Sequence, residues 1–180
     1  EIYSKNYKKI AQTIIYLPHF ISWVVVYTIL QGLLSQSDGI INGLIVSLGG
    51  TKIPFLASER WFRPVLILSE IWKEAGWGTV VYLAALSAID PAIHEAALID
   101  GASRLQRIRY IFLPCIMSTV TVMLILRMGA ILNNGLEEML LFKNSMNSAV
   151  SEVLETYSYT VGLQQGRFAF ATAIGMFQSV

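Results

Sequence analysis

The feature that most constrains this chain is its longest uncharged stretch. Residues 10–37 contain no Lys, Arg, Asp or Glu. Within this stretch, residues 14–34 are long enough to cross the hydrocarbon of a bilayer, which takes about 20 apolar residues in a helix. We therefore predict a first membrane span over 14–34. Pro18 is expected to kink it, because bundled membrane helices tolerate proline when neighbouring groups satisfy the freed carbonyl.

The composition favours a membrane protein over a soluble domain. Hydrophobic residues make up 54% of the chain and charged residues 14%, with a mean hydropathy of +0.57. The formal net charge of +1 provides no basic surface for nucleic acid. The single cysteine, Cys115, excludes a disulfide within these residues, and two histidines are too few for a multi-histidine metal site.

Three further apolar segments follow the first. They predict spans over 65–89 and 110–132, and the first half of a span over 168–180. Together the segments predict an all-α polytopic membrane helix bundle that forms one domain over residues 1–180.

The second predicted span is interrupted by three charges, Glu70, Lys73 and Glu74. Charges inside a span are costly and usually face a bundle interior or a water-filled path. Alternatively, this stretch lies at the membrane surface, with Trp72 and Trp77 in an interfacial belt. Lys73 can also pair locally with either glutamate. The sequence leaves these interpretations open.

The span count and the positive charges together predict the side of each loop. The segment before residue 10 and the loop 90–109 share one face, and 35–63 and 135–167 share the other. On the first face the six basic residues crowd beside span ends, where the positive-inside rule applies most strongly, although the second face carries five. The loop 90–109 is therefore predicted to be cytoplasmic.

The predicted cytoplasmic loop contains residues that typically start and end two short helices. Asp90 is a good N-cap, and Gly101 can adopt the left-handed conformation that ends a helix. Ser103 can cap a second helix over residues 104–110. This pattern predicts a helix–turn–helix at the membrane surface. An amphipathic helix that merely anchors the loop is the simpler alternative.

The spacing within this loop resembles a known motif. Glu95-Ala96-Ala97 is followed after three residues by Gly101 and after nine more by Ile111-x-Leu113-Pro114, where Pro114 is expected to open the third span. This spacing resembles the EAA loop of the membrane permeases in bacterial binding-protein-dependent ABC importers.

The similarity extends along essentially the whole chain. Residues 16–23, 71–78 and 124–129 look like the permeases of the LplB type, in the sugar and oligosaccharide branch. The resemblance implies a type I ABC importer permease fold, multi-pass in the bacterial cytoplasmic membrane. It also implies that the chain is a fragment lacking the family's first spans and most of its last one.

In the resembling family, the EAA loop is the coupling helix that docks on a cytoplasmic ATPase. The residues implied for this contact are Glu95, Ala96, Ala97, Asp100 and Gly101. The chain has no Gly-x-x-x-x-Gly-Lys-Ser/Thr loop, so ATP would be bound by the partner and the chain would be a transport subunit, with no catalytic residue, metal or cofactor of its own. The implied partners are two ATPase subunits, a second permease subunit, an extracytoplasmic solute-binding lipoprotein and membrane lipid.

Sugar rings have apolar faces and hydroxyl edges, which aromatic rings and planar hydrogen-bonding groups recognise. An arginine in the path would also suit the carboxylates of uronate oligosaccharides. The candidates for a translocation path are Trp72, Glu74, Arg127, Asn133, Asn134 and Glu137. Each has a simpler interpretation as a belt aromatic, a charge reaching the surface or a helix-end cap.

The outer loop 135–167 contains a short stretch with helical periodicity. Residues 148–159 predict an amphipathic helix with Val150, Val153, Leu154 and Tyr157 on one side. Packing over the outer ends of the spans is the favoured role of this helix.

Other classes of function remain open at this level. The chain could be an ABC permease for another small solute, or a channel or signalling membrane protein, which would not need the EAA spacing. An intramembrane enzyme would use Glu70 and Glu74, but no matched nucleophile or metal cluster accompanies them. A compact soluble helical domain is the remaining alternative.

Overall fold

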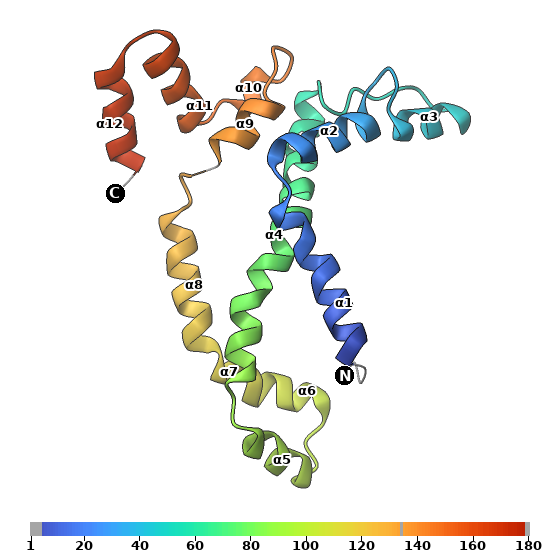
Figure 1. Ribbon diagram of the computed structural model, residues 1–180, viewed down its shortest axis with the longest axis vertical. Coiled ribbons are helices and arrows are strands. Elements are labelled where there is room, and N and C mark those ends of the chain that lie inside the picture. The colour runs from blue at the N-terminus through green and yellow to red at the C-terminus, as the bar shows by residue number, and fades with distance from the viewer. Residues whose placement is uncertain (1–4, 134, 179–180) are drawn as a thin grey trace. The chain divides into compact units, whose positions relative to one another are not determined.

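Figure 1 shows the computed structural model of the chain, which describes residues 5–133 and 135–178. Within those ranges every regular element is helical, as predicted. The elements are α1 Lys5–Tyr16, the 3₁₀ turn η1 Leu17–Phe20, α2 Trp23–Leu34, α3 Ile40–Ser47, α4 Glu59–Ser87, α5 Pro91–Ile99, α6 Arg104–Arg107, the π-helical segment η2 Ile108–Phe112, α7 Leu113–Cys115, α8 Met117–Gly129, α9 Leu136–Phe142, α10 Ser148–Ser151, α11 Leu154–Tyr159, the π-helical segment η3 Thr160–Gln164 and α12 Phe168–Gln178.

The chain divides into two compact units. One unit consists of residues 1–74 and 132–180, and the other of residues 75–131. The boundary falls inside α4, whose first half belongs to the first unit and whose second half belongs to the second. The expectation of one domain over 1–180 stays a prediction, and each unit is described by itself below.

The helix expected over residues 14–34 is interrupted at Pro18. Residues 17–20 form the turn η1, and a bend of 99° follows this turn, between residues 6–20 and 23–34. Proline has no amide hydrogen, so regular α-helical pairing ends there, but the sharp bend lies at Ile21 and Ser22, after the turn. Ser22 then starts α2 as its N-cap, with its hydroxyl accepting from the amide of Val25 at 3.4 Å.

Among the described residues, none of the helices alone combines the length and the hydropathy needed to cross a bilayer. Three bent pairs meet both requirements, by length and composition: 6–20 with 23–34, 59–87 with 91–99, and 104–115 with 117–129. The four predicted spans therefore stay predictions. Their helical bounds differ from those expected, because α4 begins six residues before position 65 and a bend of 60° precedes α8.

The core of the first unit lies between α2, the first half of α4, and α9. Its buried cluster consists of Phe55, Phe62, Val65, Leu66, Met139 and Phe142. In α4 the buried positions recur at the i, i+3, i+4 spacing that places residues on one helix face. Trp23 and Tyr27 of α2 meet the ring of Phe142 edge to face, with centroids 6.3 and 5.1 Å apart.

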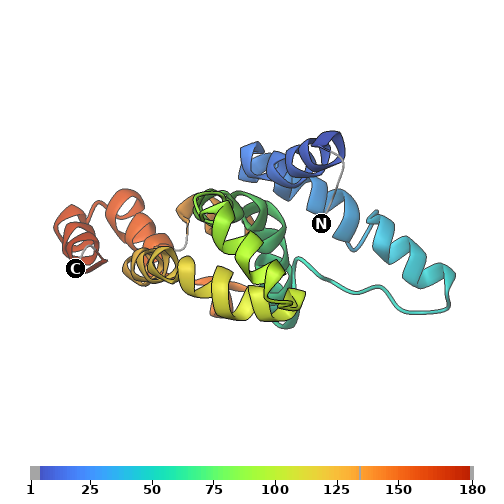
Figure 2. The same cartoon turned by 90° about the horizontal axis from the view of Figure 1, so that it is seen from below.

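A buried asparagine holds the long connection after α3. The chain runs from α2 through α3 and returns along residues 48–58 to α4 (Figure 2). Asn42 of α3 is 0% exposed, and its amide nitrogen donates to the carbonyl oxygens of Ser35 at 3.0 Å and Ile53 at 2.9 Å. Its side-chain oxygen accepts from the amide of Ile53 at 2.7 Å. One side chain therefore connects the segment before α3 to the segment after it.

The prediction of one continuous helix over residues 148–159 was wrong. Glu152 and Val153 are extended and separate α10 from α11. The buried hydroxyl of Thr156 accepts from the amide of Val153 at 3.1 Å, which favours a new helix start over continuation. Val150 and Val153 pack on the core, whereas Leu154 and Tyr157 of the predicted apolar face are exposed.

We expect Asn42→Leu to destabilise the first unit. Leucine has a similar volume but leaves the amide of Ile53 without its acceptor and removes one of the two donors to each of the carbonyls of Ser35 and Ile53, at a cost of about 2 kcal/mol. Thermal unfolding of the purified protein in detergent should show a clearly lower Tm. Asn6→Leu, at an exposed position of α1, is the matched control and should leave Tm unchanged. Equal Tm values for the two variants would contradict this account.

Candidate functional site

The loop between α4 and α8 is the first candidate site, and its first helix has the predicted caps. The carboxylate of Asp90 accepts from the amide of Ala92 at 2.9 Å. Gly101 adopts a φ of +72°, and the amides of Gly101 and Ala102 donate to the carbonyls of Leu98 and Ala97. This pair of bonds is a Schellman motif, which ends α5 at the predicted glycine.

The second helix of the loop begins as predicted and continues differently. Ser103 and Gln106 form a reciprocal capping box, with distances of 3.4 and 2.8 Å. The expected helix over 104–110 changes to π-helical pairing after Arg107. Pro114 lies inside α7 and does not open the following long helix, so that expectation was wrong. Because proline cannot donate to the carbonyl four residues before it, regular α pairing is interrupted there.

The residues implied for ATPase docking differ in exposure. Glu95, Ala96, Asp100 and Gly101 are exposed, whereas Ala97 is only 8% exposed. Ala97 therefore packs within its own loop, and the other four form the accessible surface. A hollow of about 320 Å³ lies beside the turn, lined by Asp100, Gly101, Ala102, Gln106, Tyr110 and Ile111. The docking role of all five residues stays a prediction.

Sequence reasoning missed three side chains that meet inside this loop. Nε2 of His94 in α5 lies 3.3 Å from a terminal guanidinium nitrogen of Arg107 in α6. The His94 ring also stacks on Phe112 of η2, with centroids 5.5 Å apart and planes 25° apart. These three residues are half-buried in a loop whose other side chains are mostly exposed. No spacing rule pairs position 94 with positions 107 and 112, because the turn at Gly101 separates it from them.

A polar cluster in the first unit is the second candidate site. Glu74 bridges two groups: its carboxylate lies 2.9 Å from Nδ1 of His19 and 3.2 Å from Nζ of Lys73. Lys73 is only 6% exposed and also donates to the carbonyl of His19 at 2.8 Å. Its ammonium lies 5.5 Å from the ring centroid of Trp23. The predicted local pairing of Lys73 is confirmed for Glu74.

Glu138 of α9 is a buried carboxyl that sequence reasoning also missed. It is 7% exposed, whereas its neighbour Glu137, the predicted path residue, is exposed. Burial raises the pKa of Glu138 to about 7, and the charges of three other glutamates, Glu70, Glu155 and Glu74, add to the rise. Sequence spacing gave no signal, because Glu137 lies four residues before Leu141 and Glu138 four residues before Phe142, both apolar.

The predicted path residues are distributed over both units. Trp72, Glu74, Asn133 and Glu137 belong to the first unit and Arg127 to the second, while Asn134 lies outside the described residues. Trp72 is 49% exposed and, unlike Glu74, lies at an apolar pocket. Their common role in a path stays a prediction.

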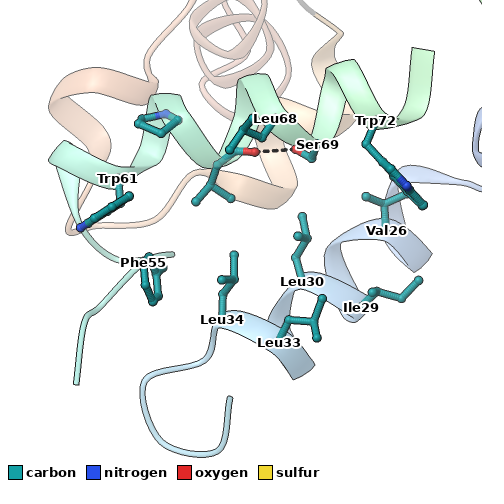
Figure 3. Close-up of a pocket in the computed structure, with 12 residues that line it drawn as sticks. Val26, Ile29, Leu30, Leu33, Leu34, Phe55, Trp61, Leu68, Ser69 and Trp72 are labelled. Carbon is teal, nitrogen blue, oxygen red and sulfur yellow. Dashed lines mark hydrogen bonds between the residues drawn. The ribbon is translucent and has the colours of Figure 1, made fainter. Parts of the chain in front are cut away.

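That pocket lies between α2 and the first half of α4 (Figure 3). Its volume is about 500 Å³. Among the side chains that line it, Ser69 alone has a hydroxyl, which donates to the carbonyl of Val65 at 2.8 Å. The lining side chains labelled in the figure are Val26, Ile29, Leu30, Leu33, Leu34, Phe55, Trp61, Leu68, Ser69 and Trp72.

A helical chain with this capped, exposed loop before α8 has the features of a transport permease, and the comparison with known proteins gives the same class. The chain belongs to the family of binding-protein-dependent transport system inner membrane components, whose sequence model matches residues 3–179. Members of this family are transport components rather than enzymes. The resemblance noted for the EAA-type spacing is thereby confirmed.

Two similar proteins come from Bacillus subtilis (strain 168). The polygalacturonan/rhamnogalacturonan transport system permease protein YteP is 50% identical over 173 residues, which cover 96% of this chain and 54% of YteP. Protein LplB is 46% identical over 180 residues, covering 100% of this chain and 57% of LplB. The chain thus spans about half the length of these relatives.

A solved structure supports the expected fold. A chain of a bacterial alginate ABC transporter, in complex with an alginate pentasaccharide-bound periplasmic protein, is 46% identical and superposes with a TM-score of 0.93. The match covers 99% of this chain and 62% of that chain. The expectation of an all-α ABC importer permease fold is confirmed.

We expect the stability of the protein to depend on pH through Glu138. Its pKa is raised from 4.5 to about 7, so the folded state binds this proton more tightly than the unfolded state. Stability should therefore fall as the pH rises from about 4.5 to about 7, by up to roughly 3 kcal/mol. Glu138→Gln removes this penalty and should raise Tm at pH 8 but not near pH 4.5.

Thermal unfolding in detergent at both pH values measures this effect. Glu137→Gln is the control, because that side chain is exposed and should behave like the wild type at either pH. A Glu138→Gln variant with the same change in Tm at pH 8 and pH 4.5 would show that the carboxyl does not titrate in this window.

Proposed function

We propose that this chain is part of the transmembrane permease subunit of an ATP-driven importer for sugars or oligosaccharides. The observation that carries the proposal is the loop from Asp90 to Phe112. It is an exposed helix with carboxylate and small side chains, held at both ends by complete caps. The sequence contains no phosphate-binding loop of its own, so such a surface suits an external ATPase.

The cargo class is supported by the named relatives. YteP is described as a permease for polygalacturonan and rhamnogalacturonan, and the solved relative imports alginate. These are acidic polysaccharides, whose carboxylates form strong hydrogen bonds with cationic side chains such as arginine. We infer that this chain serves uronate-containing oligosaccharides and that Arg127, exposed on α8, contributes to their recognition.

The proposed assembly has four kinds of partner. Two ATPase subunits would belong to the assembly, one of them docked on the cytoplasmic loop of this chain. A second permease subunit would complete the pathway, and an extracytoplasmic lipoprotein would deliver the solute. A periplasmic protein accompanies the alginate transporter in its complex, which favours the last of these. The subunit itself would cross the cytoplasmic membrane of a bacterium several times, in contact with lipid.

Mechanically, the loop would act as a rigid lever. Closure of an ATPase pair displaces the helix docked in its groove, and the connected helices change between inward-open and outward-open arrangements. A lever transmits such a displacement only if it does not deform. The Schellman motif at Gly101 and the capping box at Ser103 limit deformation of the turn between the two helices.

We expect Glu95→Lys to release the ATPase from the full-length complex. Charge reversal at an exposed docking residue replaces attraction to a basic partner with repulsion, which should lower recovery of the ATPase at least about tenfold. Co-purification through a tag on the permease measures the loss. Glu59→Lys, an equally exposed reversal at the start of α4, should retain the ATPase. Full recovery with Glu95→Lys would remove the loop as the docking site.

We expect Trp72→Ala and Arg127→Ala each to reduce oligosaccharide uptake without loss of the assembled complex. The first removes an aromatic face and the second a cation, which are the two groups that bind a uronate ring. Uptake of oligogalacturonate and substrate-stimulated ATPase activity in proteoliposomes measure the effect, which should be about tenfold. Trp77→Ala is the matched control. Unchanged uptake in both variants would refute the path assignment.

A further inference from the structure

The cytoplasmic loop contains one internal cluster that the proposed docking surface does not use. His94 contributes the ring, Arg107 the guanidinium and Phe112 the stacking partner, each from a different helical segment. We propose that His94 is a positioning residue that clamps the docking helix α5 to the entry of α8, so that a displacement of α5 moves both together. This inference rests on the proposed function, because it describes how the docked loop transmits force.

The chemistry of the pair determines the state of the histidine. A guanidinium has only donors, so Nε2 of His94 must be the acceptor in the 3.3 Å contact with Arg107. A ring that accepts at Nε2 has its donor at Nδ1. Nδ1 of His94 and Nε of Arg107 are both buried without a hydrogen-bond partner in the described part of the chain. The contact at Nε2 and the ring stack therefore join α5 to α6 and η2.

The π-helical segment explains how Arg107 and Phe112, five residues apart in one helical stretch, both face the ring of His94. Residues five apart lie about 140° apart around an α-helix, so Arg107 and Phe112 would point to different sides. In η2 the amide of Leu113 donates to the carbonyl of Ile108, five residues earlier. This wider pairing brings residues five apart onto one face. The π segment thus places the guanidinium and the phenyl ring together against His94.

The position of the clamp gives it a mechanical consequence. α5 carries the exposed residues proposed to meet the ATPase, and η2 leads through α7 into α8. Between α5 and η2 the backbone passes through the turn at Gly101, whose hydrogen bonds are all local to the turn. Without the clamp, a displaced α5 would rotate about this turn. With it, the displacement reaches the bend that precedes α8.

The test uses the full-length importer with its partner subunits in nanodiscs and proteoliposomes. Two quantities are measured: oligogalacturonate imported per ATP hydrolysed, and hydrogen exchange of the backbone amides of residues 104–112, which needs no substrate. We expect His94→Ala and Arg107→Ala each to lower the import ratio about tenfold and to speed exchange about tenfold. The double variant should be no worse than either single one, because both remove the same contact.

Two further variants separate a clamp from a general loss of folding. His94→Gln retains a side-chain acceptor for Arg107 and should restore part of the exchange protection. Arg104→Ala removes an exposed cation from the same short helix and should leave both quantities unchanged. ATPase subunits should remain bound in every variant, since none of these residues lies on the proposed docking surface.

Several results would overturn the proposal. Wild-type exchange in His94→Ala would show that the pair does not hold the segments together. A lower import ratio with unchanged exchange, or loss of the ATPase from His94→Ala, would make His94 a docking residue. Failure of the proposed function would look different: the wild-type complex would neither retain an ATPase nor import the sugar, while the exchange of His94→Ala would still decide whether the clamp exists.

Discussion

A buried lysine stabilises the corner between η1 and α2 in the first unit. Regular α-helical pairing ends at Pro18 and the chain bends by 99° between residues 20 and 23, so this change of direction needs support from outside the helix. Lys73 of α4 donates to the carbonyl of His19, and Glu74 balances the buried charge while it contacts the histidine ring. A buried ammonium is costly unless it is paired. The fixed partners make the break a defined corner against which α2 packs on α4 and α9.

The second unit uses a different principle. Its loop is mostly exposed, so little apolar burial stabilises it. Local hydrogen bonds fix the conformation of its backbone instead. Asp90, Gly101 and Ser103 close the helix ends, and the contact of His94 with Arg107 and Phe112 joins the two arms. A surface that receives a partner must expose its side chains while its backbone stays in one conformation. Caps and one internal cluster achieve this without a large core.

The candidate sites were partly predictable from sequence. Capping residues act within four positions, so Asp90, Gly101 and Ser103 were identified correctly from their neighbours. The EAA spacing similarly led to the family. The buried carboxyl of Glu138 was passed over in favour of the exposed Glu137, because two adjacent glutamates differ only in which one faces the core.

The sequence by itself determined that the chain is helical, apolar and marked by one docking-type loop, because these properties depend on composition and on spacings of a few residues. Only the tertiary structure decided that the chain bends by 99° after residue 20 and that a π segment aligns Arg107 with Phe112. It also decided which charges of α4 are buried. Those outcomes depend on groups far apart in the chain, such as His19 and Lys73, whose free energy of interaction exists only once folding brings them into contact.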